Sequence, residues 1–226
     1  MAKLYFRYGC MNSGKTVDLL KTYNNYQELG RNALILTPSI DTRSGLAKVK
    51  ARIKGLEAEA IPISPEDSIF SVLAEYGYYL RVEDFNYAEA EDKIKTYQDL
   101  HSEPVAAILV DEAQFFTRNQ VEEMSEIVDN CEIPVLAYGL KNSFKGTLFE
   151  GSAALLELAD TIEEVVTMCT FCERKATMHL LKQGDTYRTE GDDVFIGDTE
   201  YLSVCRKHYF KKLGLDSRDA YSGRIS

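Results

Sequence analysis

Short apolar runs recur along the chain up to about Met168, with longer amphipathic stretches between most of them. These runs predict strands at Lys3–Tyr8, Ala33–Thr37, Glu59–Ile63, Val105–Val110 and Pro134–Tyr138. Nearly continuous apolar strands that alternate with helices are typical of a parallel sheet covered on both faces. The pattern therefore predicts an α/β fold built on one parallel sheet with helices on its two sides.

Periodicity and capping residues predict three helices. Behind the first strand, apolar residues recur at helical spacing at Val17, Leu19, Leu20 and Tyr23. Gly30 is the expected stop of this helix. Thr117-x-x-Gln120 has the form of a capping box and predicts a helix that runs to about Asn130. A third, short helix is expected at Gly151–Ala159.

A glycine-rich loop with the spacing G-x-x-x-x-G-K-T lies between the first strand and the first helix. It consists of Gly9, Cys10, Met11, Asn12, Ser13, Gly14, Lys15 and Thr16. In this pattern the glycines let backbone N–H groups wrap phosphate oxygens, and the lysine reaches the β- and γ-phosphates. The threonine hydroxyl can ligate Mg²⁺. A glycine turn with an incidental lysine is the alternative, and the strand and helix on either side argue against it.

Two acidic residues follow the strand expected at Val105–Val110. Asp111 occupies the place from which a P-loop enzyme holds Mg²⁺, usually through water. Glu112 is next to it and could accept a proton from an attacking hydroxyl or water. The alternative is a pair of surface acids at a strand end. With the P-loop present, we interpret Asp111 as a magnesium ligand and Glu112 as a general base.

Cysteine and histidine recur as two knuckles, Cys169-x-x-Cys172 and Cys205-x-x-His208, with 32 residues between them. This spacing and mixed ligand set predict a tetrahedral Cys₃His zinc site, which would be structural because four protein ligands leave no open position. A buried apolar cysteine cluster and a redox C-x-x-C pair are the alternatives. Cys131 is interpreted as a small core residue, and Cys10 as a loop residue exposed to oxidation.

Composition narrows the class of protein. The 226 residues are 45% hydrophobic and 27% charged, as in an ordinary globular protein, and the net charge is −10. An acidic chain is unlike a general nucleic-acid binder, so we expect no nucleic-acid partner. No apolar run has membrane-spanning length and no signal peptide is visible, so we expect no membrane partner and a cytoplasmic location. An odd number of cysteines, five, argues against a disulfide framework.

The composition changes after Met168, where short pieces rich in Gly, Asp and Thr lie between the cysteines. We therefore expect a nucleotide-binding α/β domain at residues 1–168 and a small metal-binding domain with a C-terminal tail at residues 169–226. Residues 75–102 are acidic and rich in tyrosine and are interpreted as an insertion, whose simplest form is a solvated extra hairpin of helices. Within it, a charged surface helix is expected at Ala88–Leu100.

In this order, the P-loop, Asp-Glu-x-Gln-Phe-Phe and the two zinc knuckles closely resemble the thymidine kinase family with a zinc-bearing lasso domain. The resemblance covers nearly the whole chain except about residues 75–102. Additional matching stretches are Asp41-Thr42-Arg43, Tyr138-Gly139-Leu140 with Phe144, Leu148-Phe149-Glu150-Gly151, and Tyr201 before Ser203-Val204-Cys205. Four separated motifs agree, which makes the resemblance specific.

The resemblance implies transfer of phosphate from ATP to the 5′-hydroxyl of thymidine. The implied ATP contacts are the P-loop residues 9–16 together with Asp111, Glu112, Ala113 and Gln114. It further implies that Thr16 and Asp111 serve Mg²⁺, that Glu112 takes the proton of the 5′-hydroxyl, and that Arg43 lies near the transferred phosphate. Charge neutralisation by that arginine would favour the transition state. A homotetramer and feedback inhibition by thymidine triphosphate (dTTP) are implied as well.

The thymine pocket implied by the resemblance has two parts. The apolar slot corresponds to Met11, Phe115, Phe144 and Phe149. The lasso that would close over the base by main-chain hydrogen bonds corresponds to Val194, Ile196 and Gly197, with Tyr201 adjacent. Plain core packing is the alternative for each phenylalanine. The lasso departs from many relatives, which have two glycines and one more residue, and Lys141 stands where some relatives carry an acid.

Three other functions remain open at this point. A P-loop ATPase acting on nucleic acid fits Asp-Glu-Ala-Gln superficially, although the chain is short and acidic. A zinc-ribbon binding module without catalysis would have no need for Lys15, Thr16, Asp111 and Glu112 together. A kinase for another nucleoside is the nearest rival. One methyl group is worth only about 1–3 kcal/mol of discrimination, so we expect some phosphorylation of deoxyuridine.

Overall fold

The centre of the fold is a six-stranded sheet in a computed structural model that describes residues 1–40, 47–53, 55–78, 80, 104–191 and 200–215. Its strands are β1 (Leu4–Gly9), β2 (Asn32–Pro38), β5 (Ile61–Ile63), β6 (Val105–Val110), β7 (Val135–Gly139) and β8 (Thr161–Val165). They lie in the order β5-β2-β6-β7-β1-β8, and every neighbouring pair is parallel. The predicted parallel α/β fold is confirmed.

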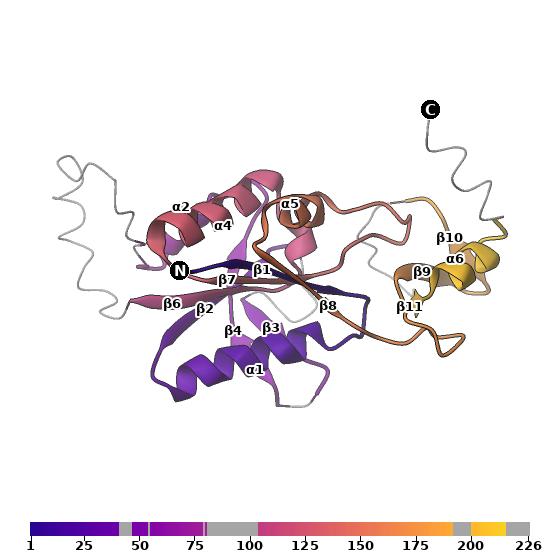
Figure 1. Ribbon diagram of the computed structural model, residues 1–226, viewed down its shortest axis with the longest axis horizontal. Coiled ribbons are helices and arrows are strands. Elements are labelled where there is room, and N and C mark those ends of the chain that lie inside the picture. The colour runs from indigo at the N-terminus through magenta and orange to yellow at the C-terminus, as the bar shows by residue number, and fades with distance from the viewer. Residues whose placement is uncertain (41–46, 54, 79, 81–103, 192–199, 216–226) are drawn as a thin grey trace.

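Helices cover both faces of this sheet (Figure 1). Helix α1 (Lys15–Glu28) lies on one face, and α2 (Ile69–Glu75), α4 (Arg118–Cys131) and α5 (Glu150–Leu158) lie on the other. The strands supply apolar side chains to both sides, as β2 does with Leu34 and Leu36 on the α4 side and Ala33 and Ile35 on the α1 side. Alternate side chains of a strand point to opposite faces, so a sheet buried on both sides needs apolar residues at every position.

The capping box predicted for α4 is present. The Thr117 hydroxyl accepts a hydrogen bond from the Gln120 N–H, and the Gln120 side chain accepts one from the Thr117 N–H. The reciprocal pair satisfies two backbone donors that the first turn of a helix leaves unpaired. Helices α1 and α5 also lie within about two residues of their predicted bounds.

One predicted strand is divided in two. The run Glu59–Ile63 belongs partly to β4 (Glu57–Glu59), which forms an antiparallel hairpin with β3 (Lys48–Lys50), and partly to β5 at the edge of the main sheet. Between them lies Ala60, whose N–H donates to the carbonyl of Ala47 in the register of the β3–β4 hairpin. Ala60 is buried against the α1 side of the sheet, so the apolar pattern continues from β4 into β5. For this reason the sequence pattern predicted a single strand.

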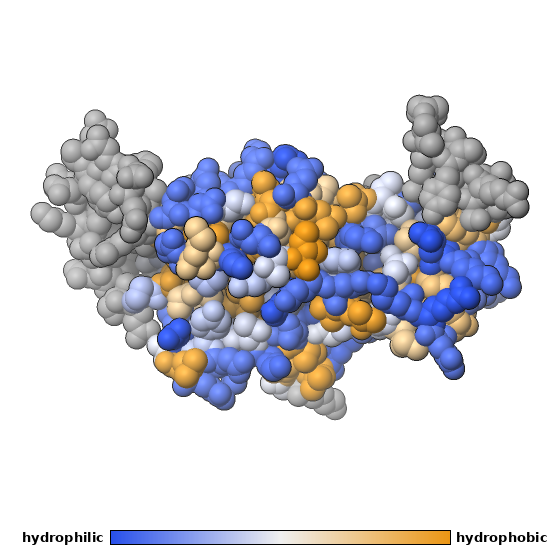
Figure 2. All heavy atoms as spheres, in the orientation of Figure 1, coloured by the Kyte–Doolittle hydropathy of each residue, from blue (hydrophilic) through white to orange (hydrophobic). Residues whose placement is uncertain are grey.

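Strand β8 was not predicted, because Thr161-Ile-Glu-Glu-Val is too polar to resemble a buried parallel strand. It is an edge strand beside β1, where one flank faces solvent and charged side chains are tolerated. Glu163 pairs with Arg7 at 2.6 Å, and Glu164 pairs with Lys175 at 2.6 Å. On the face in Figure 2, apolar side chains gather over α5 and the neighbouring β8.

A second, smaller sheet lies beyond the carboxyl ends of the main strands (Figure 1). It is antiparallel, with the order β10-β9-β11, and consists of β9 (Met178–Gln183), β10 (Thr186–Arg188) and β11 (Glu200–Val204). Helix α6 (Arg206–Lys212) packs on it around a separate apolar core of Leu180, Val204, Tyr209 and Phe210. We call this sheet, α6 and the turn Cys169–Cys172 the small lobe.

Among the described helices, none is both long and apolar enough to cross a lipid bilayer. The expected helix at Ala88–Leu100 and almost all of the 75–102 insertion lie outside the described residues.

Candidate active site

The P-loop connects β1 to α1 and needs glycine at two of its positions for steric reasons. Gly14 is one of them, with a positive φ angle of 90°. Asn12 also has a positive φ, of 63°. Gly9 has no such φ, but a Cβ there would lie 2.5 Å from the carbonyl oxygen of Val165 and 2.6 Å from Ser13 Oγ. Gly9 therefore permits a close approach of β8 to the loop, and Gly14 permits the left-handed turn that begins α1.

Lys15 is buried in this loop, with a relative exposure of 8%. Its ammonium group donates to the carbonyl oxygens of Gly9 at 3.1 Å and Cys10 at 3.0 Å, across the concave side of the loop. Among the described residues, Ser13 Oγ is the buried side-chain nitrogen or oxygen that lacks a hydrogen-bond partner. A buried cation and an unsatisfied hydroxyl in a turn of backbone N–H groups suit a bound phosphate, which supplies several acceptor oxygens.

The carboxylate of Asp111 lies beside the first turn of α1. Its Oδ2 is 3.4 Å from the hydroxyl of Thr16, and the residue is 7% exposed. Strand β6 delivers Asp111 to this place, and the Asp111 N–H donates to the carbonyl of Leu36 in β2. A hydroxyl and a carboxylate at this separation are hard oxygen donors that fit Mg²⁺ next to a phosphate.

Glu112 adopts the left-handed backbone conformation, with φ 47° and ψ 42°, immediately before the 3₁₀ turn η2 (Ala113–Phe115). Its carboxylate accepts a 2.6 Å hydrogen bond from the side-chain amide of Gln114, whose oxygen in turn accepts the N–H of Leu140 at 2.8 Å. Gln114 is 2% exposed. A Cβ on Gly139 would lie 2.8 Å from the Gln114 oxygen, so the glycine at the end of β7 allows this bridge. The bridge holds the carboxylate in one orientation.

Two of the expected pocket aromatics pack against each other. The rings of Phe115 and Phe149 make an edge-to-face contact at 5.6 Å. Phe144 is only 2% exposed, so its side chain is buried, as in the core-packing alternative. Its carbonyl oxygen accepts a hydrogen bond from the Tyr209 hydroxyl at 2.8 Å. Tyr201 lies in β11 of the small lobe. Arg43, Val194, Ile196 and Gly197 lie outside the described residues.

The predicted metal ligands lie together in the small lobe. The ligand atoms of Cys169, Cys172, Cys205 and His208 all lie within 4.8 Å of one another. His208 Nδ1 is 3.4 Å from the sulfurs of Cys169 and Cys205, and the sulfurs of Cys172 and Cys205 are 3.8 Å apart. Zinc–sulfur bonds of about 2.3 Å in a tetrahedron place the ligand atoms roughly 3.8 Å apart, so the donors could hold a metal such as zinc.

Electrostatics also favour a metal at this cluster. Burial would raise the pKa of the Cys169 thiol, but backbone N–H groups at Cys205 and Phe171 and the side chain of His208 together lower it to about 6. A thiol that readily loses its proton is the form that binds a metal ion. All five cysteines are free of disulfides.

Cys10 differs from the prediction, because it is buried, at 7% exposure, rather than exposed to oxidation. The small lobe lies against the P-loop, and Cys10 Sγ is 3.9 Å from the carbonyl oxygen of Met178. Burial raises the pKa of Cys10 to about 11, and the neighbouring ammonium of Lys15 offsets only part of this effect. Cys131 is half-buried at the end of α4 and packs against the main core.

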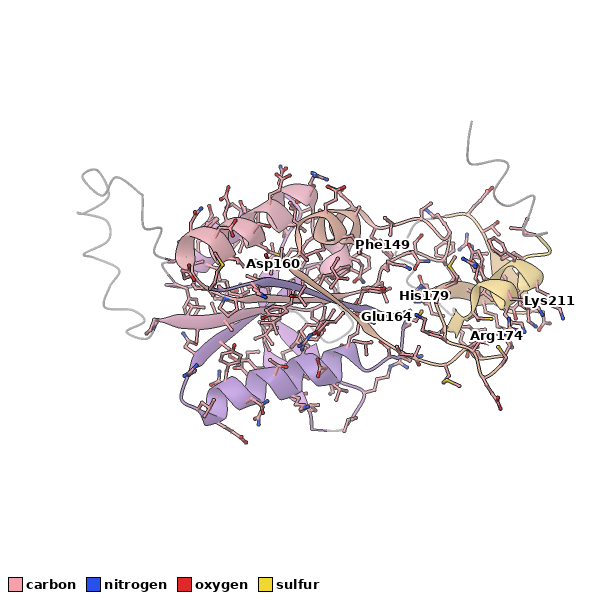
Figure 3. The ribbon with its side chains drawn as sticks, viewed as in Figure 1. Phe149, Asp160, Glu164, Arg174, His179 and Lys211 are labelled. Carbon is pink, nitrogen blue, oxygen red and sulfur yellow. The ribbon has the colours of Figure 1, made fainter. Side chains whose placement is uncertain are left out.

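Two residues that the sequence did not single out join the small lobe to the P-loop. His179 of β9 is buried at the junction of the two lobes (Figure 3) and contacts the backbone of Met11, as does Ser203 of β11. His179 belongs to no motif, and Ser203 lies in a stretch that matches the family but was given no role. The contact of His179 with Met11 spans 168 residues of sequence, so no local signal could predict it.

Comparisons with known proteins agree with this geometry. The sequence model of the family described as thymidine kinase matches residues 2–76 and 77–209. A thymidine kinase of Streptococcus pyogenes is 42% identical over 211 residues, which is 93% of this chain and 98% of that protein. A thymidine kinase of Streptococcus agalactiae has the same identity and coverage. Among solved structures, a Pif1 helicase from Candida albicans aligns with 73% of this chain and 36% of its own. Its TM-score is 0.39 at 12% identity, too low to support an argument.

The family match extends through the P-loop, the acidic pair after β6 and all four candidate metal ligands, so it covers both lobes and not only a generic phosphate site. On this evidence, the chain belongs to the thymidine kinase family.

Proposed function

We propose that this protein is an enzyme that transfers the γ-phosphoryl group of ATP to the 5′-hydroxyl of thymidine. Membership of the thymidine kinase family supports the substrates. The observation that carries the reaction type is the acidic pair beside the P-loop, where Asp111 lies 3.4 Å from Thr16 and Glu112 follows directly. Phosphoryl transfer needs a phosphate cradle, a cation site and a base close together. The P-loop is proposed as the cradle, Thr16 and Asp111 as the cation site, and Glu112 as the base.

In this proposal, the P-loop holds the phosphates of ATP. Lys15 exchanges its contacts with the carbonyls of Gly9 and Cys10 for phosphate oxygens, and Ser13 donates its unpaired hydroxyl. Thr16 and Asp111 hold Mg²⁺, which when bound neutralises the negative charge of the phosphate oxygens. The remaining ATP contacts, Ala113 and Gln114 among them, stay proposals that follow from the family resemblance.

Glu112 is proposed as the general base. Its carboxylate accepts the proton of the thymidine 5′-hydroxyl as the oxygen attacks the γ-phosphorus, the bond from that phosphorus to the β,γ-bridging oxygen breaks and ADP leaves. Gln114 holds the carboxylate in one orientation. Arg43 is proposed to stabilise the charge of the transferred group. Proton transfer by a positioned side chain contributes about 10²- to 10⁴-fold to the rate, so the loss of Glu112 should lower kcat by a measurable factor.

Thymidine is proposed to lie between Phe115 and Phe149 on one side and the segment with Val194, Ile196 and Gly197 on the other, with Met11, Phe144 and Tyr201 nearby. An apolar slot gains little from one methyl group, so deoxyuridine is a weaker substrate by about 1–3 kcal/mol. Zinc at the four ligands is proposed to stabilise the small lobe. A homotetramer and inhibition by dTTP are further proposals from the resemblance. A domain boundary after residue 168 is proposed from the change in composition there.

The test is to incubate the purified protein with Mg²⁺, ATP and a panel of nucleosides, and to measure the phosphorylated products. The proposal predicts product from thymidine, less product from deoxyuridine and none from purine nucleosides. Efficient phosphorylation of a purine nucleoside with none of thymidine would contradict the substrate assignment. A Lys15→Ala variant serves as the control for contaminating kinases.

A further inference from the structure

The peptide groups of one P-loop residue are bound from outside the loop on both sides. The N–H of Met11 donates to His179 Nε2 at 3.0 Å, and the carbonyl of Met11 accepts the Ser203 hydroxyl at 2.7 Å. Met11 lies in the middle of the loop, directly before Asn12, whose φ is 63°. The two hydrogen bonds therefore fix the peptide planes that lead into the left-handed turn.

The two side chains come from neighbouring strands of the small lobe. His179 in β9 and Ser203 in β11 are direct cross-strand partners in the antiparallel register. Directly opposed residues present their side chains on the same face of a sheet, a few ångströms apart. Both are buried, at 2% and 8% exposure. Together they form a pair that grips one residue of the P-loop, which we call the Met11 clamp.

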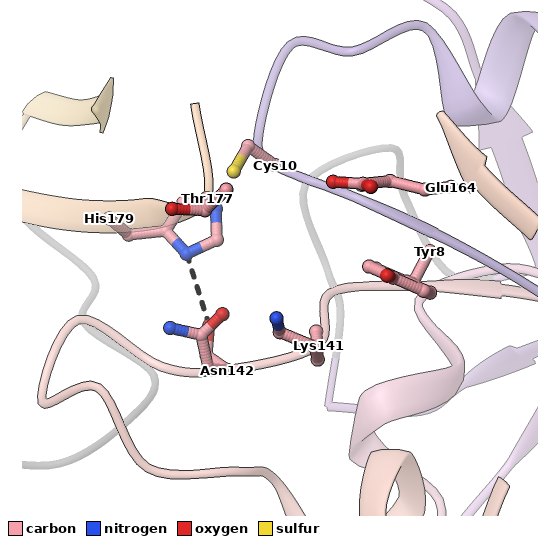
Figure 4. Close-up of a pocket in the computed structure, with 8 residues that line it drawn as sticks. Tyr8, Cys10, Lys141, Asn142, Glu164, Thr177 and His179 are labelled. Carbon is pink, nitrogen blue, oxygen red and sulfur yellow. Dashed lines mark hydrogen bonds between the residues drawn. The ribbon is translucent and has the colours of Figure 1, made fainter. Parts of the chain in front are cut away.

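A third contact fixes which nitrogen of His179 carries the proton. His179 Nδ1 lies 3.0 Å from the carbonyl oxygen of Asn142, which can only accept, so Nδ1 donates and Nε2 is left as the acceptor for Met11 (Figure 4). Burial, together with the ammonium groups of Lys15 and Lys141, lowers the pKa of His179 to about 4, so the ring is neutral near pH 7. His179 thus connects β9, the loop after β7 and the P-loop.

Ser203 is in turn tied to the metal-binding turn. Its carbonyl accepts both the N–H and the hydroxyl of Thr170, each at 2.9 Å. Thr170 lies directly after the candidate ligand Cys169, and Ser203 lies two residues before Cys205. The backbone of Ser203 is therefore hydrogen-bonded to the turn that carries Cys169 and continues directly toward Cys205.

We infer that His179 and Ser203 are positioning residues that hold the P-loop in its phosphate-binding shape, so that the small lobe supports ATP binding as well as nucleoside binding. This rests on the proposed function, because it assumes that the loop binds the phosphates of ATP. A loop that is already held in its bound conformation loses less conformational entropy when the phosphates arrive. Removing the clamp leaves every phosphate contact in place but lets the loop relax.

The test is the dissociation constant of Mg·ATP, measured by calorimetry without nucleoside, for the wild type and for Ser203→Ala. One net hydrogen bond corresponds to roughly a fivefold change in an equilibrium constant, so Ser203→Ala should raise the constant about fivefold. His179→Ala should raise it by at least as much. Thr186→Ala is the matched control, because it removes an exposed hydroxyl that donates to Gln183 within the same small sheet, and it should leave the constant unchanged.

Zinc content and melting temperature are measured on each variant. Weaker ATP binding with full zinc content and an unchanged kcat at saturating ATP supports the clamp. If the wild type binds Mg·ATP and both clamp variants bind it equally well, the inference is wrong while the proposed function stands. If the wild type itself does not bind Mg·ATP, the proposed function fails first. His179→Ala changes a strand without metal ligands, so it decides the matter if Ser203→Ala fails to fold.

Discussion

Glu112 has a backbone conformation that a non-glycine residue adopts only at a cost. Its φ of 47° and ψ of 42° place it in the left-handed region, which costs of the order of 1 kcal/mol for a residue of this kind. The same geometry turns its carboxylate toward the buried amide of Gln114. The sequence motif predicted that Glu112 would lie beside the magnesium site. Neither its strained backbone nor its hydrogen bond with Gln114 has a local signal in the sequence.

Replacing Glu112 by glutamine tests the proposed base. Glu112→Gln keeps the size of the side chain but removes the proton acceptor, so kcat should fall at least about 100-fold while the dissociation constant of Mg·ATP stays close to that of the wild type. Steady-state kinetics and calorimetry check the two values. Glu122→Gln, at an exposed position of α4, is the control. Unchanged turnover in Glu112→Gln would remove Glu112 as the base.

Cys10 provides a second test at the scale of one residue. Its thiol is buried and its pKa is raised to about 11, so little thiolate exists near pH 7. Brief treatment of the native protein with iodoacetamide should leave Cys10 unlabelled, and the same treatment in urea should label it, as mass spectrometry of the peptides can show. Rapid labelling of native Cys10 would mean that the small lobe does not cover the P-loop in solution.

At the scale of elements, the parts that could be predicted were those with a complete local signal. The P-loop, the capping box of α4 and the two metal knuckles each lie within a few residues of sequence, and buried strands such as β6 are apolar throughout. Strand β8 was missed because an edge strand tolerates charge. The contacts of His179 and Ser203 were missed because they form only when two distant sheets meet.

The metal knuckles are the element whose loss should be most visible. Cys169→Ser should lose bound metal and lower the melting temperature, because the small lobe has a small core that relies on its ligands. Zinc content and thermal unfolding measure both effects. Cys131→Ser changes a half-buried cysteine far from the cluster and should keep its metal. If Cys169→Ser retains both metal and nucleoside affinity, the zinc assignment and the role of the small lobe are wrong.

At the scale of the whole molecule, the two lobes are joined through the buried hydrogen bonds of His179 and Ser203 to Met11. Of these two residues, His179 has a side chain that can be protonated. The folded-state pKa of His179 is lowered from 6.5 to about 4, chiefly by burial and further by Lys15 and Lys141. Between about pH 6.5 and 4, His179 therefore binds a proton in the unfolded chain but stays neutral in the folded protein. The stability associated with His179 is intact above pH 6.5 and is lost progressively as the pH falls to about 4.

A shift of this size corresponds to about 3 kcal/mol of unfolding free energy. Between pH 7 and 4 the wild type should thus lose about 3 kcal/mol more stability than His179→Gln, which cannot titrate. Urea denaturation at several pH values measures both proteins, and subtracting the variant removes the contribution of carboxylates that they share. Parallel curves for the two proteins would contradict a buried, neutral His179.

The most direct test of the central claim is the coupling between ATP consumption and nucleoside product. With γ-labelled ATP, Mg²⁺ and thymidine, the wild type should form one labelled thymidine 5′-monophosphate for each ADP, and ADP formation should nearly stop without nucleoside. ADP that accumulates without labelled nucleotide would instead indicate a P-loop ATPase, and would contradict the proposed phosphoryl transfer to thymidine.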